Sequence, residues 1–102
     1  MESDWKKFQA IVPGLRERFI AEQNRRLVIL LSSSNKTETE RFWAAQKFIE
    51  KQAKILCDCL DGHSRSKMFL AMLSMKSVGM LKSEDLADFS DELKRQVLDW
   101  PT

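Results

Sequence analysis

Apolar residues recur at intervals of three and four positions in nearly every segment of the chain, which is the spacing of one face of an α-helix. Trp5, Phe8 and Val12 open this pattern, and Pro13 and Gly14 interrupt it. We therefore expect a short first helix and a second helix that begins near Pro13, because proline fits the first turn of a helix. One continuous helix with a kink at Pro13 is the alternative.

The second expected helix buries an inner face of leucines and aromatic residues, made up of Leu15, Phe19, Ile20, Leu27, Leu30 and Leu31. Its last five residues, LVILL at 27–31, also have the composition of a short buried strand. No second convincing strand is present to pair with them, so a helix is favoured. A loop follows at residues 32–36.

The next expected helix has the clearest signals in the chain. Thr37 and Glu40 have the spacing of a capping box, which places the start of the helix at Thr37, and the pattern continues to Asp61. Gly62 stands where a left-handed residue ends a helix, and Ser64 stands where it can cap the next one. The inner face is a broad apolar stripe: Phe42, Ala45, Ile49, Leu56 and Cys59, widened by Phe48, Ala53, Ile55 and Leu60.

Two further helices complete the expected fold. The first runs from about Arg65 to Val78 and is apolar on nearly every side, so it lies centrally in a bundle or is half covered by a partner. The second begins at Ser83 and continues to Trp100. With only 3 glycines and 2 prolines in 102 residues, the chain is predicted to be all-α, a compact bundle of four to five helices with short connections and a single domain over residues 1–102.

Composition fits a globular protein, with 43% hydrophobic and 31% charged residues and a formal net charge of +2. The charge is uneven: residues 62–82 carry four basic residues and no acid, and residues 83–102 carry six acids and two basic residues. Either these segments neutralise each other or the basic one meets an acidic partner. No apolar run approaches the length of a membrane span and no secretory signal is visible, so a cytoplasmic protein with reduced cysteines is expected.

Chemistry-bearing residues are densest at residues 57–67, CDCLDGHSRSK. Cys57, Cys59 and His63 could start a metal or redox site, but side chains two apart on a helix point about 200° away from each other. With His63 as the only histidine, an oriented nucleophile and base are not indicated. We therefore expect no metal, no cofactor, no catalytic residues and no enzyme activity.

The same stretch offers a candidate anion-binding site. It comprises Ser64, Arg65, Ser66 and Lys67, at the cap and first turn of the expected helix. Free amides and the positive end of the dipole attract anions there. Basic residues at this end oppose the dipole, which is understandable if they bind a ligand or pair with acids of the chain.

A second basic group lies on the helix expected from Pro13, where it could bind nucleic acid: Arg16, Arg18, Arg25 and Arg26. Glu17 and Glu22 are interleaved with these arginines. A solvated face with internal salt bridges is therefore the other interpretation.

Four of the five methionines fall in one segment, and methionine is favoured at surfaces that repack around partners. The candidate partner-binding residues are Met68, Phe69, Met72, Met75 and Met80. The leading hypothesis is a small cytoplasmic adaptor or regulator that binds a protein partner, or itself as a homodimer, through this apolar helix. The alternative is a regulator that binds nucleic acid through the arginines above and the basic residues at 65–67.

Overall fold

A computed structural model describes residues 2–101. It contains four α-helices, α1 (Glu2–Leu31), α2 (Glu38–Leu60), α3 (Met68–Ser77) and α4 (Asp91–Asp99), with two short 3-10 helices, η1 (Arg65–Lys67) and η2 (Ser83–Leu86). No strand occurs in this part of the chain, so the all-α prediction is confirmed, including the helix at residues 27–31. Among residues 2–101, no helix has both the length and the apolar composition needed to cross a membrane.

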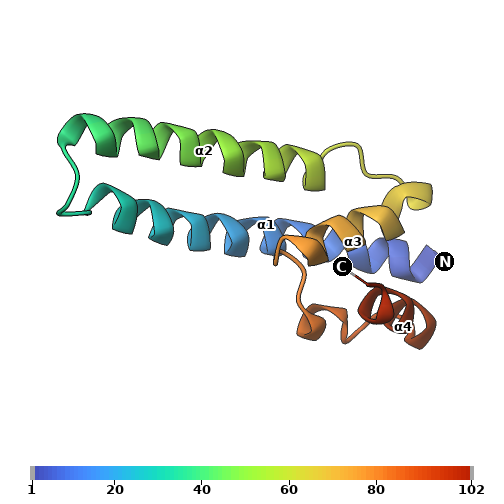
Figure 1. Cartoon of the computed structure of the whole chain (residues 1–102). Helices are drawn as coiled ribbons and strands as arrows, with labels where there is room; N and C mark the ends of the chain where they lie inside the picture. The colour runs from blue at the N-terminus through green and yellow to red at the C-terminus, as the bar shows by residue number, and fades with distance from the viewer. Residues whose placement is uncertain (1, 102) are drawn as a thin grey trace.

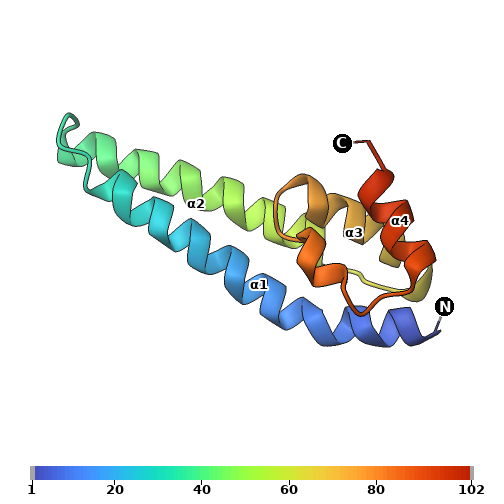
Figure 2. The same ribbon diagram turned by 90° about the horizontal axis from the view of Figure 1, so that it is seen from below.

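The molecule is elongated, with extents of 52 × 23 × 23 Å. α1 and α2 form a long antiparallel hairpin, and α3, η2 and α4 gather around the end of the hairpin that holds the N-terminus (Figures 1 and 2). The other end, residues 20–31 of α1 and 38–53 of α2, consists of two helices alone, and we call it the distal half. This shape departs from the compact bundle expected from the sequence.

α1 runs without interruption through Pro13, so the expectation of two helices is wrong and the alternative of one continuous helix holds. Proline removes one backbone hydrogen bond, and here the carbonyl that loses its donor belongs to Gln9, an exposed residue that water can reach. Phe8, Leu15 and Phe19 are buried on either side of Pro13. Their burial in one core keeps both parts within one continuous helix, which changes direction in its N-terminal part (Figure 2).

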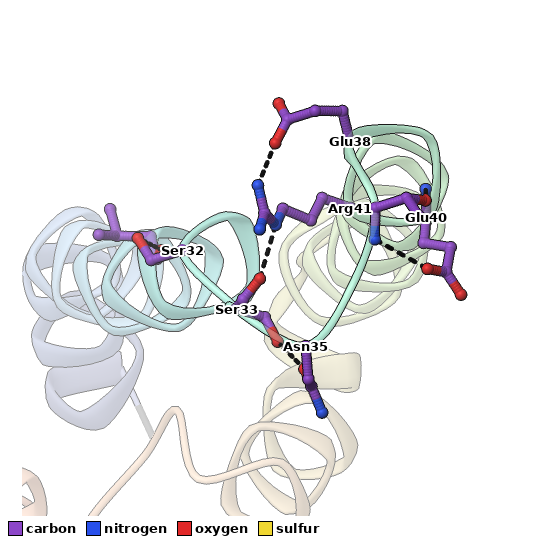
Figure 3. A network of polar contacts seen from close by, with 8 residues as sticks. Ser32, Ser33, Asn35, Glu38, Glu40 and Arg41 are labelled. Carbon is purple, nitrogen blue, oxygen red and sulfur yellow. Dashed lines mark hydrogen bonds and ion pairs between the residues drawn. The ribbon is translucent and has the colours of Figure 1, made fainter.

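The α2 boundaries match the sequence signals. The Glu40 amide donates to Thr37 Oγ1 over 3.1 Å, and the Thr37 amide donates to Glu40 Oε1 over 2.8 Å, so the capping box is confirmed. In the preceding loop, Arg41 Nε donates to the Ser33 carbonyl over 2.6 Å, which ties the turn to the first turn of α2 (Figure 3). Gly62 adopts φ +70°, the expected left-handed conformation after the helix.

The C-terminal part of the chain differs from the prediction of one helix beginning at Ser83. η2 ends at Leu86, and α4 begins after Ser90, whose Oγ accepts a hydrogen bond from the Leu93 amide over 3.3 Å. A local cap at Ser90 therefore competes with continuation of the helix, and tertiary contacts of both pieces favour the break. Similarly, the helix expected from Arg65 opens as the 3-10 turn η1 and becomes α-helical at Met68.

A single core lies where α3 meets the N-terminal half of α1. Its fully buried side chains are Phe8, Met72, Met75, Met80, Leu86 and Val97. α3 contacts both α2 and α4, which explains why it is apolar on nearly every side. The core thus occupies one end of the hairpin and leaves the distal half outside it.

Polar contacts attach the last segments to this core. Arg18 binds both carboxylate oxygens of Asp85, at 2.9 and 2.6 Å, and also donates to the Met80 carbonyl over 2.9 Å. Lys76 Nζ donates to the carbonyls of Val97, Leu98 and Trp100 over 2.9 to 3.1 Å. These carbonyls belong to the end of α4, where a cation offsets the negative end of the helix dipole.

Asp4 joins the two ends of the described chain. It is buried, and its two carboxylate oxygens accept from the Ser90 amide over 2.9 Å and from the Ser90 hydroxyl over 2.7 Å. Burial alone raises the pKa of the Asp4 carboxyl, but the two hydrogen bonds from Ser90 outweigh it and hold the pKa below its ordinary value. The charged carboxylate is therefore the form that the fold stabilises.

Replacement of Arg18 tests the attachment of η2. We expect Arg18→Ala to lower the free energy of unfolding by about 2 kcal/mol, because Asp85 and the Met80 carbonyl lose their donor in a half-buried site. Arg16→Ala is the matched control, since the Arg16 guanidinium only approaches Glu17 at 3.9 Å and is exposed, so a change within about 0.5 kcal/mol is expected. Urea unfolding of both variants measures this difference, and equal losses would contradict it.

Acid should weaken the contact between Asp4 and Ser90. Because the pKa of Asp4 is lower in the folded protein than in the unfolded chain, its contribution is complete at neutral pH and is lost as the pH falls below about 4. Asp4→Asn should therefore be less stable than the wild type at pH 7, by about 1–3 kcal/mol. In urea unfolding across pH 7 to pH 2, the two proteins should converge at low pH; a gap that stays constant would show that Asp4 is not stabilised as a carboxylate.

Candidate functional site

The methionine segment lies inside the core. Met68, Met72, Met75 and Met80 are all buried, and two of them, Met72 and Met75, have no exposed surface. The expectation that these side chains form a partner-binding surface is therefore corrected for the folded monomer: α1, α2 and α4 already cover them. Phe69 alone of the five predicted residues stays partly exposed, where its ring meets that of Trp100 edge to face with 5.6 Å between centroids.

The predicted anion-binding residues are mostly occupied by the chain itself. Arg65 holds the carboxylate of Glu2 with two hydrogen bonds, at 2.7 and 2.9 Å, and its guanidinium lies 5.9 Å from the centroid of the Trp5 ring. Ser64 lies at the expected cap position but makes no capping bond; its Oγ is 3.3 Å from that of Ser66. Lys67 ends η1, so the four residues form a 3-10 turn, not the first turn of an α-helix.

The arginines of α1 also have partners within the protein. Arg18 is bound to Asp85, while Arg25 and Arg26 approach Glu22 at 3.1 and 3.8 Å. Among residues 2–101, no ion pair joins the basic segment 62–82 to the acidic segment that follows it. The expected neutralisation between these neighbouring segments is therefore replaced by pairing of both with α1, through Glu2 and Arg18.

Cys57, Cys59 and His63 have structural surroundings. Cys57 is exposed and Cys59 buried, as expected from their opposite directions on α2. Burial raises the pKa of the Cys59 thiol, with a smaller contribution from Asp58, so the thiol is not activated. His63 Nε2 donates to the Cys59 carbonyl over 2.7 Å, and its ring packs edge to face on Phe8. The described part of the chain holds no cluster of side chains suited to a metal ion.

Two grooves run along the hairpin, one on each side of the contact between α1 and α2. Gln23 and Gln52 line both grooves, which places them in the seam. One groove, of about 370 Å³, is bordered by Val78, Gly79 and Lys82 and therefore lies on the side of α3 and η2. Its other lining residues include most of the charges on this side of the hairpin: Arg18, Glu22, Arg26 and Lys51.

In the contact between α1 and α2, the side chain of Gln23 has a polar atom without a hydrogen-bond partner. The side chain is buried, and its Oε1 is the only buried side-chain oxygen or nitrogen in residues 2–101 without a hydrogen-bond partner. An unpaired buried carbonyl costs stability, so the contact between α1 and α2 is not optimised at this level of the hairpin. The distal half is therefore held together less well than the core end.

The opposite groove is apolar and lies away from α3 and α4. It has a volume of about 140 Å³ and is lined by Ile20, Asn24 and Leu27 of α1 and by Phe48, Ile49, Ala53 and Leu56 of α2, besides the two seam glutamines. Leu31 and Phe42 continue the same helical spacing to the tip of the hairpin, where both line a further hollow. None of these residues is charged.

We call this surface the hairpin face and define it as Ile20, Asn24, Leu27, Leu31, Phe42, Ile49, Ala53 and Leu56. Its residues on α1 are spaced by four, three and four, and those on α2 by seven, four and three, which follows the spacing of positions a and d in a coiled coil. The position between Phe42 and Ile49 on this side of α2 holds Gln46, an exposed polar residue. Leu31, Phe42 and Ile49 are 47%, 62% and 51% exposed. Each helix therefore carries one apolar stripe in the seam and a second, of which Leu31, Phe42 and Ile49 are exposed while Leu56 packs partly against the core.

The sequence predicts that these residues are apolar-face positions but not that they divide between two stripes. Ile20, Leu27 and Leu31 belong to the inner face expected for the helix from Pro13, and Phe42 and Ile49 to the broad face expected for the helix from Thr37. The width of the apolar face indicates a second contact surface, since a helix with a single neighbour needs only a narrow apolar stripe. Which part would face the neighbour required the structure.

Comparison with known proteins finds no matching protein family, no similar curated protein and no similar solved structure.

The burial of the methionines gives a direct test. We expect Met72→Asp to unfold the protein, because a charge in a site with no exposed surface costs a large part of the roughly 5–15 kcal/mol that stabilises a domain of this size. Leu70→Asp, on the exposed side of the same helix at 64% exposure, should stay within about 0.5 kcal/mol of the wild type. Circular dichroism and urea unfolding measure both variants. A folded Met72→Asp variant would show that Met72 is a surface residue and not part of the core.

Proposed function

We propose that this protein is a non-catalytic interaction module that binds a partner protein through the hairpin face. The observation that carries the proposal is the second apolar stripe, at coiled-coil spacing on two adjacent helices and without a charged residue. A helix or helix pair is the shape that such a groove accepts, since its ridges fit between the side chains of Ile20, Leu27 and Ile49. The partner would then add the helices that complete a bundle in the distal half, where the monomer has only α1 and α2.

The exposed apolar area supports an interface. A fully exposed large side chain presents roughly 150–250 Å², so the exposed parts of Leu31, Phe42 and Ile49 alone amount to roughly 300 Å². With the groove between them, the face reaches the size at which apolar patches mark interaction sites. Phe42 has the properties of an anchor residue, being aromatic and 62% exposed, with Leu31 and Trp43 lining the same hollow.

Nucleic-acid binding remains the weaker alternative. It would use Arg16, Arg18, Arg25, Arg26 and the residues at 64–67. Arg18 and Arg65 hold Asp85 and Glu2, and Glu22 lies beside Arg25 and Arg26, so little positive charge is left to attract phosphates. No feature of the described surface favours it over protein binding.

The proposal includes the cytoplasm as the place of action. The exposed Cys57 thiol is compatible with a reducing compartment, where it would stay unpaired. No enzyme activity is proposed, because no described histidine, cysteine or carboxylate is arranged as a nucleophile with its base.

Partner binding can be tested with a charge in the hairpin face. The tagged protein is used to recover bound proteins after nuclease treatment, and the amount of each is compared between wild type, Ile49→Glu and Ile29→Glu. We expect Ile49→Glu to lose binding at least tenfold, because a carboxylate would be desolvated in the groove.

Ile29→Glu is the matched control in this experiment. Ile29 is more exposed than Ile49, at 72%, and lies on the side of α1 turned away from the hairpin face. Its replacement should leave binding unchanged while adding the same charge. Equal recovery by all three proteins would contradict the proposal, and recovery that nuclease abolishes would favour the alternative.

A further inference from the structure

We infer that the occupant of the hairpin face is a second copy of this chain, so that two distal halves pair into a four-helix bundle. This inference rests on the proposed function and names the partner for it. In a four-helix bundle every helix contacts two neighbours and carries a correspondingly wide apolar stripe. In the distal half, α1 and α2 have the wide stripe, but on the side of the hairpin face each has only the other as a neighbour.

The hairpin face has the features that a twofold-symmetric interface requires. In a twofold dimer the same patch appears on both sides of the interface and must fit itself. The hairpin face combines hollows with exposed side chains, since Ile49 lines the groove that holds Leu27 and Leu56, and Leu31 and Phe42 line the hollow at the tip. The eight residues that define it carry no charge, so like charges can meet only at its edge, where Glu38 and Arg41 line the hollow beside Leu31 and Phe42.

Asn24 is the one polar residue among the eight and lies at a core-type position of the second stripe. Its amide group has both donors and an acceptor, so it can pair with the same group of another copy. A single buried asparagine of this kind fixes the register and the number of helices in coiled coils, at some loss of stability. An asparagine inside an otherwise apolar stripe is what a specific self-association requires.

The rest of the fold leaves this face accessible. The charged groove, bordered by Val78, Gly79 and Lys82, lies on the other side of the seam, and α3 and α4 gather at the opposite end of the molecule (Figure 2). A second hairpin can therefore approach along the full distal half without meeting the core of either copy.

The expected interface is modest in size. From Phe42 to Leu56 a helix is roughly 20 Å long, and two helices side by side are roughly 20 Å wide, which gives a footprint of about 400 Å² before side-chain relief is counted. With that relief, the area buried per copy approaches the lower end of stable interfaces, at roughly 600 Å². Such a dimer is expected to dissociate in the micromolar range.

Sedimentation equilibrium of the full chain from about 1 to 500 µM tests the inference, with circular dichroism to verify folding of each variant. We expect a reversible dimer for wild type and Ile29→Glu, and a monomer for Ile49→Glu, whose charge enters the interface twice. Asn24→Leu should tighten association at least fivefold, because two leucines are buried at a core position more favourably than a pair of amides.

Contrary results separate the inference from the proposed function. A wild-type monomer at every concentration, or a dimer that persists in Ile49→Glu, overturns self-association, as does unchanged association of Asn24→Leu. If the wild type is monomeric but Ile49→Glu still loses recovery of another protein, the proposed function stands with a different partner. If that recovery is also unaffected, both fail.

Discussion

The packing of α3 against the N-terminal half of α1 is the interaction on which the rest of the structure depends. Phe8, Leu15 and Phe19 of α1 meet Met72 and Met75 in a core that excludes water from both methionines. About a hundred residues bury one core, and this chain places it at one end of a long hairpin. Everything that is exposed in the distal half follows from that placement.

Polar contacts attach the C-terminal segments to the core, and many of these contacts are made by backbone groups of those segments and not only by their charged side chains. Arg18 and Lys76 donate to carbonyls of Met80 and of the end of α4, and Asp4 accepts from the Ser90 amide. These groups sit at breaks and ends of helices, where backbone donors and acceptors have no partner within the helix. The basic and acidic residues that look like candidate sites in the sequence are therefore used mainly to close such ends.

The consequence for function is a separation of the molecule into a stable end and an open end. At the core end most large apolar side chains are buried, although Leu70, Leu98 and Trp100 stay exposed, and two ion pairs attach α1 to the later segments. The distal half has a seam with an unsatisfied Gln23 oxygen and a second apolar stripe beside it. Because apolar area without a partner costs free energy in water, the open end is the site at which we propose association.

Local signals in the sequence determined much of this protein. The spacing of apolar residues gave helices throughout, the Thr37 and Glu40 pair located the start of α2, and Gly62 located its end, because caps and left-handed turns depend on a few adjacent residues. The opposite directions of Cys57 and Cys59 followed from helix geometry alone.

Tertiary structure decided what local signals leave open. It carried α1 through Pro13, since aromatic residues on both sides entered one core, and it broke the last helix at Ser90, since Asp4 accepts hydrogen bonds there. It buried the methionines and left Ile49 exposed, although both lie on apolar stripes. Periodicity shows that a side chain belongs to an apolar face, but which face finds a neighbour depends on contacts between segments far apart in the chain.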